Sequence, residues 1–261
     1  MSEAAFLRCI RPACAATHDL TEPVYACTAC GGLLDVAYDW DRLTPPGNLA
    51  YFQERWRTRH EPLDFSGVWR FRELLPFAPA DVLVTIGEGQ TILQPPDVHA
   101  LDLPLKPGHL HLQYEGLNPS GSFKDNGMAA AITMAHRLGR RRVGCASTGN
   151  TSASMALYAS LSRLPDGSPM RGVVFIGAGK IAYGKLAQAL DFGALTIQIE
   201  GDFDACLKRI REATETLELY LMNSINPFRI EGQKTIMYRV LEGLDWEPPD
   251  WIVCPGGNLG N

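Results

Sequence analysis

The sequence predicts an α/β protein whose parallel sheets carry helices on both faces. From about residue 80 onward, short apolar runs alternate with segments in which apolar residues recur at helical spacing. This regular alternation is typical of strand–helix–strand units in a parallel sheet. The chain has 261 residues, of which 46% are hydrophobic and 20% are charged. It is therefore long enough to bury a sizeable core in two compact domains with a small appendage.

Composition and charge also argue against two classes of partner, nucleic acids and membranes. The formal net charge is -5, whereas nucleic-acid-binding domains concentrate positive charge. The chain has no run of about 18 apolar residues that would span a bilayer. Its first residues, M-S-E-A-A-F-L-R-C, lack the apolar core of a secretory signal. We therefore expect a cytoplasmic protein that binds neither nucleic acid nor membranes.

The front of the chain holds four of the seven cysteines. An odd total in an unsecreted chain argues against a disulfide framework. The front cysteines form two pairs, C-I-R-P-A-C and C-T-A-C-G-G, and two pairs on tight turns could surround one tetrahedral zinc with four thiolates. A metal-free cysteine lobe and a redox pair remain alternatives. In each case we expect a structural lobe, because four protein ligands leave no open position for catalysis. The candidate ligands are Cys9, Cys14, Cys27 and Cys30.

The stretch at 40–79 is rich in Pro, Trp and Arg. It predicts short helices or extended segments that connect the lobe to the body and pack against that body. Beyond it, the alternation of apolar runs and helical spacing gives the elements of the α/β body. Strands are expected at 81–86, 109–115, 142–147, 171–177, 195–200, 219–222 and 251–254, and helices at 122–138, 151–164, 181–191, 203–217 and 232–244.

Three polar loops follow expected strands, and ligands of open parallel sheets bind at the carboxyl ends of the strands. In the first loop, N-P-S-G-S-F-K-D-N-G, Pro119 and Gly121 make a turn and Ser122 can cap the next helix. Lys124 then lies in the first turn of that helix, where the positive end of the helix dipole lowers an amine's pKa and favours a neutral nucleophile. The alternative for Lys124 is a surface lysine at the start of a helix.

The second loop, A-S-T-G-N-T-S-A-S, crowds small hydroxyl and amide groups at a helix start, an arrangement that binds anions. Ordinary helix capping is the alternative, but it does not need so many polar residues. The third loop, V-C-P-G-G-N-L-G-N, is rich in glycine, which permits backbone NH groups to converge on a phosphate. It lacks both the Lys-Ser/Thr ending of a nucleotide P-loop and the G-x-G-x-x-G spacing.

Taken together and in this order, the motifs resemble the fold-type-II pyridoxal-phosphate (PLP) enzymes, which are tryptophan synthase β-like. S-F-K-D with S-T-G-N-T is specific for that group, and N-S-I-N-P-F-R-I-E-G-Q-K is most similar to the threonine synthase family. The front lobe and I-G-E-G-Q-T also look like segments of that family. The resemblance implies a zinc-ribbon-like lobe at 1–40, a connection and the first part of a large PLP domain at 41–127, a small α/β domain at 128–225, and a continuation of the large domain at 226–261.

The same resemblance implies a function. It would be PLP-dependent conversion of O-phospho-L-homoserine and water to L-threonine and phosphate, by a carbon–oxygen lyase of threonine biosynthesis that works as a homodimer. Lys124 would form the internal aldimine and then shuttle protons, and Asn150 would bond the cofactor's ring hydroxyl. The phosphate of the cofactor would be held by Gly257, Asn258, Leu259, Gly260 and Asn261. The substrate would be held by Thr148, Thr151, Asn223, Ser224 and Arg229. A surface arginine after a turn is the alternative for Arg229, although its planar fork of donors suits an anion.

Some features depart from the family pattern. Asn126 stands where an arginine is more usual, and Ile92 replaces a proline. The last residue, Asn261, falls within the expected phosphate loop, so we expect a truncated chain that lacks the C-terminal part of the large domain and the residue facing the pyridine nitrogen. The related cysteate synthases and threonine dehydratases remain alternatives within the enzymes. An inactive truncated relative that acts as a binding module is the alternative outside them.

Overall fold

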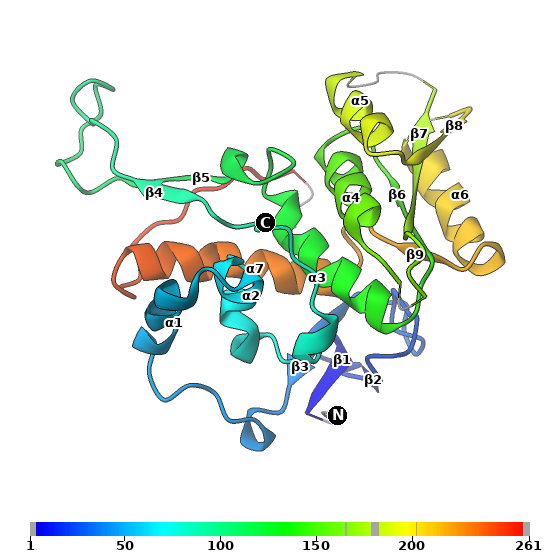
Figure 1. Cartoon of the computed structure of the whole chain (residues 1–261), viewed down its shortest axis with the longest axis horizontal. Helices are drawn as coiled ribbons and strands as arrows, with labels where there is room; N and C mark the ends of the chain where they lie inside the picture. The colour runs from blue at the N-terminus through cyan, green and yellow to red at the C-terminus, as the bar shows by residue number, and fades with distance from the viewer. Residues whose placement is uncertain (1–3, 165, 179–182, 202, 258–261) are drawn as a thin grey trace.

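The computed structural model describes residues 4–164, 166–178, 183–201 and 203–257 (Figure 1). Its central feature is a sheet of four strands in the order β8-β7-β6-β9, in which every neighbouring pair is parallel. The predicted parallel sheet is thus confirmed. The strands are β6 (Arg142–Ala146), β7 (Arg171–Gly177), β8 (Leu195–Ile199) and β9 (Leu219–Leu221).

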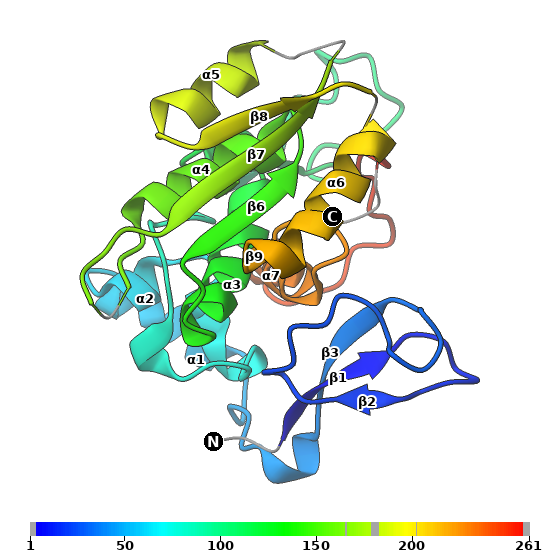
Figure 2. The ribbon, with the colours of Figure 1, turned by 90° about the vertical axis from the view of Figure 1, so that its right-hand side faces the viewer.

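Helices cover both faces of this sheet, as Figure 2 shows. Along β7, Val174 and Ile176 join the core shared with the helices on one face, whereas Val173 and Phe175 join a second cluster with α6 on the other. This alternation follows from the two-residue period of a strand, and burial on both faces explains why β7 contains a continuous apolar run. The covering helices are α4 (Asn150–Leu161) and α5 (Tyr183–Asp191) on one face and α6 (Phe203–Thr216) on the other.

Two further helices, α3 (Lys124–Arg137) and α7 (Pro227–Gly243), pack against each other with their backbones almost touching. A Cβ added at Gly232 would lie 2.1 Å from the carbonyl oxygen of Asn126, and one added at Gly127 would lie 2.8 Å from that of Arg229. Only glycine permits such an approach. Because both contacts lie near the helix starts, they bring the start of α3 close to the start of α7.

The cysteine lobe is a small antiparallel sheet in the order β2-β1-β3. Buried side chains of its strands, such as Leu7 and Val36, belong to the same hydrophobic core as the helices of the body. The lobe therefore packs against the body, near β9 and the start of α7 (Figure 2). Its strands are β1 (Ala5–Cys9), β2 (Thr17–His18) and β3 (Leu34–Tyr38).

The connection consists of short helices, as predicted, and it packs against the body. Val68, Trp69 and Phe71 are completely buried. Arg70 forms a buried ion pair with Glu242 of α7 at 2.6 Å. The short helices are η1 (Trp40–Arg42), α1 (Ala50–Glu54), η2 (Arg55–Thr58), α2 (Pro62–Phe65), η3 (Trp69–Leu74) and η4 (Ala80–Val82).

Two predicted strands are wrong. The segment 81–86 is not a strand because the backbone of Val84 bonds side chains: its NH donates to Thr133 and its carbonyl accepts from the Trp69 indole. The apolar segment 251–254 is exposed, and no strand pairs with it within the part of the chain that the structure describes. Near the expected strand at 109–115, β5 (Leu112–Tyr114) pairs antiparallel with β4 (Ile92–Gln94) and is followed by η5 (Glu115–Leu117).

The predicted helices of the body are present, although α7 begins at Pro227, five residues before the expected start at 232. No helix in the described ranges is both long enough and apolar enough to cross a bilayer. The expected domain boundaries stay predictions.

Candidate active site

Lys124 is the first residue of α3, and it is buried, with 9% of its surface exposed. Its Nζ lies 3.8 Å from the centre of the Phe123 ring. Among the described residues, no carboxylate forms an ion pair with it. Burial and, to a smaller extent, the positive charge of Arg229 together lower the pKa of this amine from 10.5 to about 8. The fraction of Lys124 that is neutral near neutral pH can act as a nucleophile or as a proton acceptor.

The loop before Lys124 is held by the next residue, Asp125, which is completely buried. Its carboxylate accepts hydrogen bonds from the backbone NH of Ser120 at 2.7 Å and from the Ser120 hydroxyl at 2.6 Å. It also accepts one from Ser154 on α4. Gly121 has a φ of +79°, which explains the glycine at this turn. Ser122 accepts only a long bond of 3.4 Å from the Lys124 NH, so Asp125 fixes the loop more firmly than the predicted serine cap.

A second, partly buried network centres on Glu115. Arg239 of α7 forms an ion pair with it at 2.8 Å. The side-chain amides of Asn118 and Asn126 both donate to its other carboxylate oxygen, at 2.9 and 3.0 Å. Asn118 in turn accepts a hydrogen bond from the Gly89 NH. The network joins the loop before Lys124, the first turn of α3 and the helix α7 into one unit. Sequence reasoning missed it because Arg239 lies 124 residues after Glu115 in the chain.

Glu88, the acidic residue of the G-E-G segment, is also completely buried. It accepts hydrogen bonds from Tyr158 of α4 at 2.8 Å, from Thr85 at 2.9 Å, from the Ile86 NH at 3.1 Å and from Ser66. A buried carboxylate is tolerated only when it is well satisfied by donors. The G-E-G segment is therefore anchored to the helix that carries the second polar loop.

The second loop lies at the start of α4, directly after β6. The side chains of Thr148, Asn150 and Thr151 are half-buried there. Ser147 accepts from the Gly149 NH and thus shapes the turn. The amide oxygen of Asn150 is buried and has no hydrogen-bond partner within the described ranges. Because buried polar atoms are normally paired, this orphaned atom suggests a ligand at the start of α4.

A further set of predicted substrate-binding residues follows β9: Asn223, Ser224 and Arg229. Arg229, in the first turn of α7, is 2% exposed and donates from Nη1 to the carbonyl of Met222 at 2.9 Å, while its Nε has no partner in the described part of the chain. Burial lowers its pKa to about 10. Asn223 bonds both the NH and the carbonyl of Ala146 at 3.0 Å, so its amide fixes the carboxyl end of β6. Ser224 is half-buried beside it.

The predicted phosphate loop is only partly visible. Gly257 is exposed, whereas Asn258, Leu259, Gly260 and Asn261 lie outside the described residues. The structure therefore brings the first two loops and the Arg229 segment together through α3, α4 and α7, while the role of 257–261 stays a prediction.

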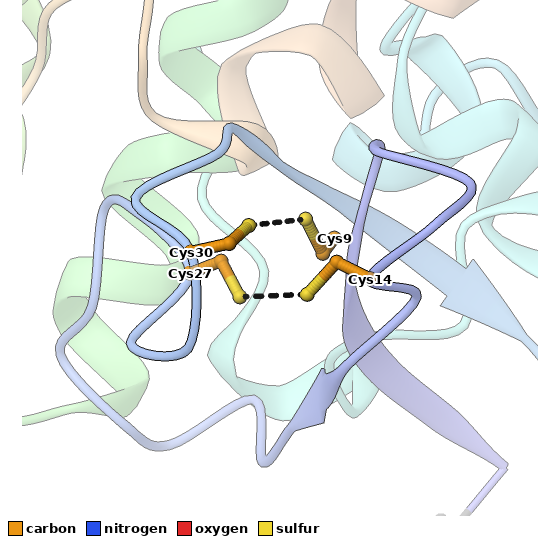
Figure 3. A group of neighbouring side chains, drawn as sticks. All are labelled: Cys9, Cys14, Cys27 and Cys30. Atoms are coloured by element: carbon orange, nitrogen blue, oxygen red, sulfur yellow. Dashed lines mark hydrogen bonds between the residues drawn. The ribbon is translucent and has the colours of Figure 1, made fainter.

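The four front cysteines lie together on two facing turns (Figure 3). Their sulfur atoms all lie within 4.8 Å of one another, with 3.5 Å between Cys9 and Cys30 and 3.7 Å between Cys14 and Cys27. All four are free thiols. A hydrogen bond from His18 is the main cause that lowers the pKa of Cys27 to about 6.

Comparison with known proteins places this geometry in context. Residues 84–261 match the family model described as "Pyridoxal-phosphate dependent enzyme". The threonine synthase of Methanocaldococcus jannaschii is 42% identical over 97% of this chain and 58% of its own length. That of Methanosarcina acetivorans is 42% identical over 98% of this chain and 57% of its own length. Among solved structures, maize serine racemase matches 59% of this chain and 45% of its own, with 21% identity and a TM-score of 0.49. The chain thus spans just under three fifths of the length of the two synthases.

Proposed function

The chain belongs to the pyridoxal-phosphate-dependent enzyme family, and on that premise we propose that it carries out the threonine synthase reaction. In that reaction O-phospho-L-homoserine and water give L-threonine and phosphate. The observation that carries the proposal is the buried Lys124, whose lowered pKa and position beside Arg229 join a base to an anion-binding group. The identity of 42% to two threonine synthases supports the choice of reaction.

The described residues fit pyridoxal phosphate. Lys124 offers a buried amine for the cofactor's aldehyde, and the unpartnered amide oxygen of Asn150 offers an acceptor for the ring hydroxyl. Residues 257–261 would hold the phosphate. When bound, the cofactor withdraws electrons from the substrate and makes its Cα proton acidic.

The chain's own residues would supply the remaining chemistry. Nζ of Lys124 would accept the Cα proton and then move a proton at Cβ, which requires a neutral amine. Arg229 would bind an anionic group of the substrate with its guanidinium fork, and its unpartnered Nε supports that role. Thr148, Thr151 and Ser224 are half-buried and could donate hydroxyl groups to the substrate's phosphate or carboxylate. Because the Asn223 amide bonds Ala146 with both ends, we assign it chiefly to positioning.

The test is turnover of O-phosphohomoserine by the chain loaded with pyridoxal phosphate, measured as released phosphate and as threonine. Lys124→Ala should abolish both products, since it removes the proposed base. Lys106→Ala, a change of an exposed lysine, should leave them unaltered. Preferential release of phosphate from O-phosphoserine would point to a cysteate-synthase-like reaction instead. Binding of the cofactor without turnover of either substrate would contradict the proposal.

We also propose that the cysteine cluster binds a structural zinc ion. Tetrahedral zinc–thiolate sites have bonds of about 2.3 Å, which separate the sulfurs by about 3.8 Å. The two distances of 3.5 and 3.7 Å are close to that value. Gly31 adopts a φ of +69° and donates its NH to the Cys27 carbonyl, which gives the second turn its tight form.

Elemental analysis of the purified chain tests the zinc proposal. We expect equimolar zinc that is lost in Cys30→Ser and retained in Cys254→Ser, a change of an exposed cysteine outside the cluster. Zinc-free protein with full stability would refute it. A homodimer, which rests on the family resemblance, completes the proposal, together with the cytoplasmic location expected from the sequence.

A further inference from the structure

The cysteine lobe donates or accepts two hydrogen bonds that the proposed reaction does not use. Both are made with the segment 219–231, which contains Arg229. This segment comprises β9, the turn with Asn223 and Ser224, and the start of α7. One contact comes from Tyr25, two residues before Cys27 of the cluster. The other comes from Tyr38 at the end of β3, the strand that pairs with Cys9 through Leu34.

Tyr25 bonds the free edge of β9. In the sheet order β8-β7-β6-β9, β9 pairs with β6 on one side only. An edge strand leaves alternate NH groups without a strand partner. The Leu221 NH donates to the Tyr25 hydroxyl at 2.8 Å, and the ring of Tyr25 packs 5.8 Å from that of Tyr220. The carbonyl of Leu221 accepts from the Asn226 side chain at 2.8 Å. The lobe and the cap of α7 thus both bond Leu221, on the edge of β9 that does not pair with β6.

Tyr38 holds the start of α7. Its hydroxyl donates to Glu231 at 2.6 Å, and Glu231 is completely buried. Burial raises the pKa of this carboxyl group, which also forms an ion pair with Lys234 one turn further along α7. Residues 229 and 231 project from opposite sides of a helix, because two residues correspond to about 200° of rotation. Glu231 therefore faces the lobe while Arg229 faces the side of Met222 and the candidate site.

We propose that Tyr25 and Tyr38 are positioning residues for Arg229, and that the cysteine lobe serves the site by holding the 219–231 segment in place. The inference rests on the proposed function for its kinetic readout. Arg229 is fixed within this segment through Met222, whose neighbour Leu221 is bonded to Tyr25. Release of either tyrosine lets Arg229 move relative to Lys124, and the site then binds anions less tightly while the base is retained.

The experiment compares the cofactor-loaded full chain with Tyr25→Phe and Tyr38→Phe. KM for O-phosphohomoserine and the inhibition constant of inorganic phosphate should each rise about threefold to tenfold, the net worth of one hydrogen bond. The kcat should change less than about twofold, because Lys124 is untouched. Deuterium uptake by amides of 219–231 should accelerate in both variants. Tyr51→Phe, which alters an exposed tyrosine bonded to Glu73, is the matched control.

Unchanged uptake in 219–231, or a rise spread evenly over the whole chain, would overturn the proposal. A fall in kcat with constant KM would do so as well. If no variant turns over O-phosphohomoserine, the proposed function fails, while deuterium uptake and calorimetric binding of inorganic phosphate still decide the role of the tyrosines. If Tyr38→Phe does not fold, Tyr25→Phe and Glu231→Gln provide the same comparison. Removal of zinc by a chelator should likewise accelerate deuterium uptake by the amides of 219–231.

Discussion

Removing the positive charge of Arg229 should raise the pKa of Lys124. Burial is the larger cause of the low pKa of this lysine and Arg229 is the second. With a pKa of about 8, roughly a quarter of the amine is neutral at pH 7.5, compared with about one molecule in a thousand at the reference value of 10.5. In Arg229→Gln the midpoint should therefore rise above about 8 but stay below 10.5, because the burial of Lys124 persists.

Competitive acetylation measures this titration directly. The cofactor-free chain is labelled briefly with acetic anhydride at a series of pH values, and the peptide that contains Lys124 is quantified by mass spectrometry. Labelling follows the neutral fraction of the amine, and the exposed Lys106 in the same samples corrects for decay of the reagent.

Arg142→Gln is the matched control, since Arg142 is exposed and begins β6 at the end opposite the site. It should leave the midpoint of Lys124 unaltered. A wild-type midpoint near 10.5 would refute the electrostatic reasoning. Equal midpoints in the wild type and Arg229→Gln would show that burial acts alone.

Three further predictions concern stability. Gly232→Ala should lower the free energy of unfolding by about 2–3 kcal/mol in urea, because a Cβ there lies 2.1 Å from the Asn126 carbonyl and α3 and α7 must separate. Tyr158→Phe should lower it by about 1–2 kcal/mol, because buried Glu88 loses a donor at 2.8 Å. The pKa of Lys124 is lower in the folded chain, so the unfolded chain binds more protons between pH 8 and 10.5. The contribution of Lys124 to stability should therefore rise with pH in that window and be absent in Lys124→Met.

Each of these has its own control. Gly184→Ala on α5 should be neutral or slightly stabilising, since a Cβ there meets nothing within 4 Å. A loss as large as that of Gly232→Ala would show that the helix crossing is not the cause. Ser160→Ala removes a half-buried hydroxyl from the same helix as Tyr158 and should cost less than Tyr158→Phe. For the pH dependence, parallel stability curves for the wild type and Lys124→Met would contradict the lowered pKa.

Sequence patterns predicted well those strands and helices whose own spacing of apolar residues matches the faces that are buried. β7 is apolar from Gly172 to Ile176 because both of its faces are covered there, so a continuous apolar run identified it. The segment 81–86 has a similar pattern but is not a strand, because Thr133 and Trp69 take the hydrogen bonds of Val84. Those partners come from distant parts of the chain, so no local pattern could reveal them. For α7, the sequence N-P at 226–227 was a usable start signal, since Asn226 caps the helix and Pro227 opens it.

The candidate site divides in the same way. Lys124 and Asn150 were found because each stands in a short motif at a helix start. Glu115 and Arg239 were missed, although their ion pair fixes the loop before Lys124, since 124 residues separate them. A buried ion pair of this kind leaves no spacing signal in the sequence. It becomes visible only when α3 and α7 are packed together.

The helix α7 connects these observations. Arg229 faces the candidate site, Glu231 bonds Tyr38 of the cysteine lobe, Arg239 pairs with Glu115, and Glu242 pairs with Arg70 of the connection. Four separate parts of the chain are therefore positioned by one helix. The position of that helix is in turn set by its backbone contact with α3 at Gly232. A shift of α7 would disturb Arg229, the loop before Lys124 and the lobe together, because this one helix carries Arg229 and bonds the other two. The glycine at this crossing is thus required by the site as well as by the fold.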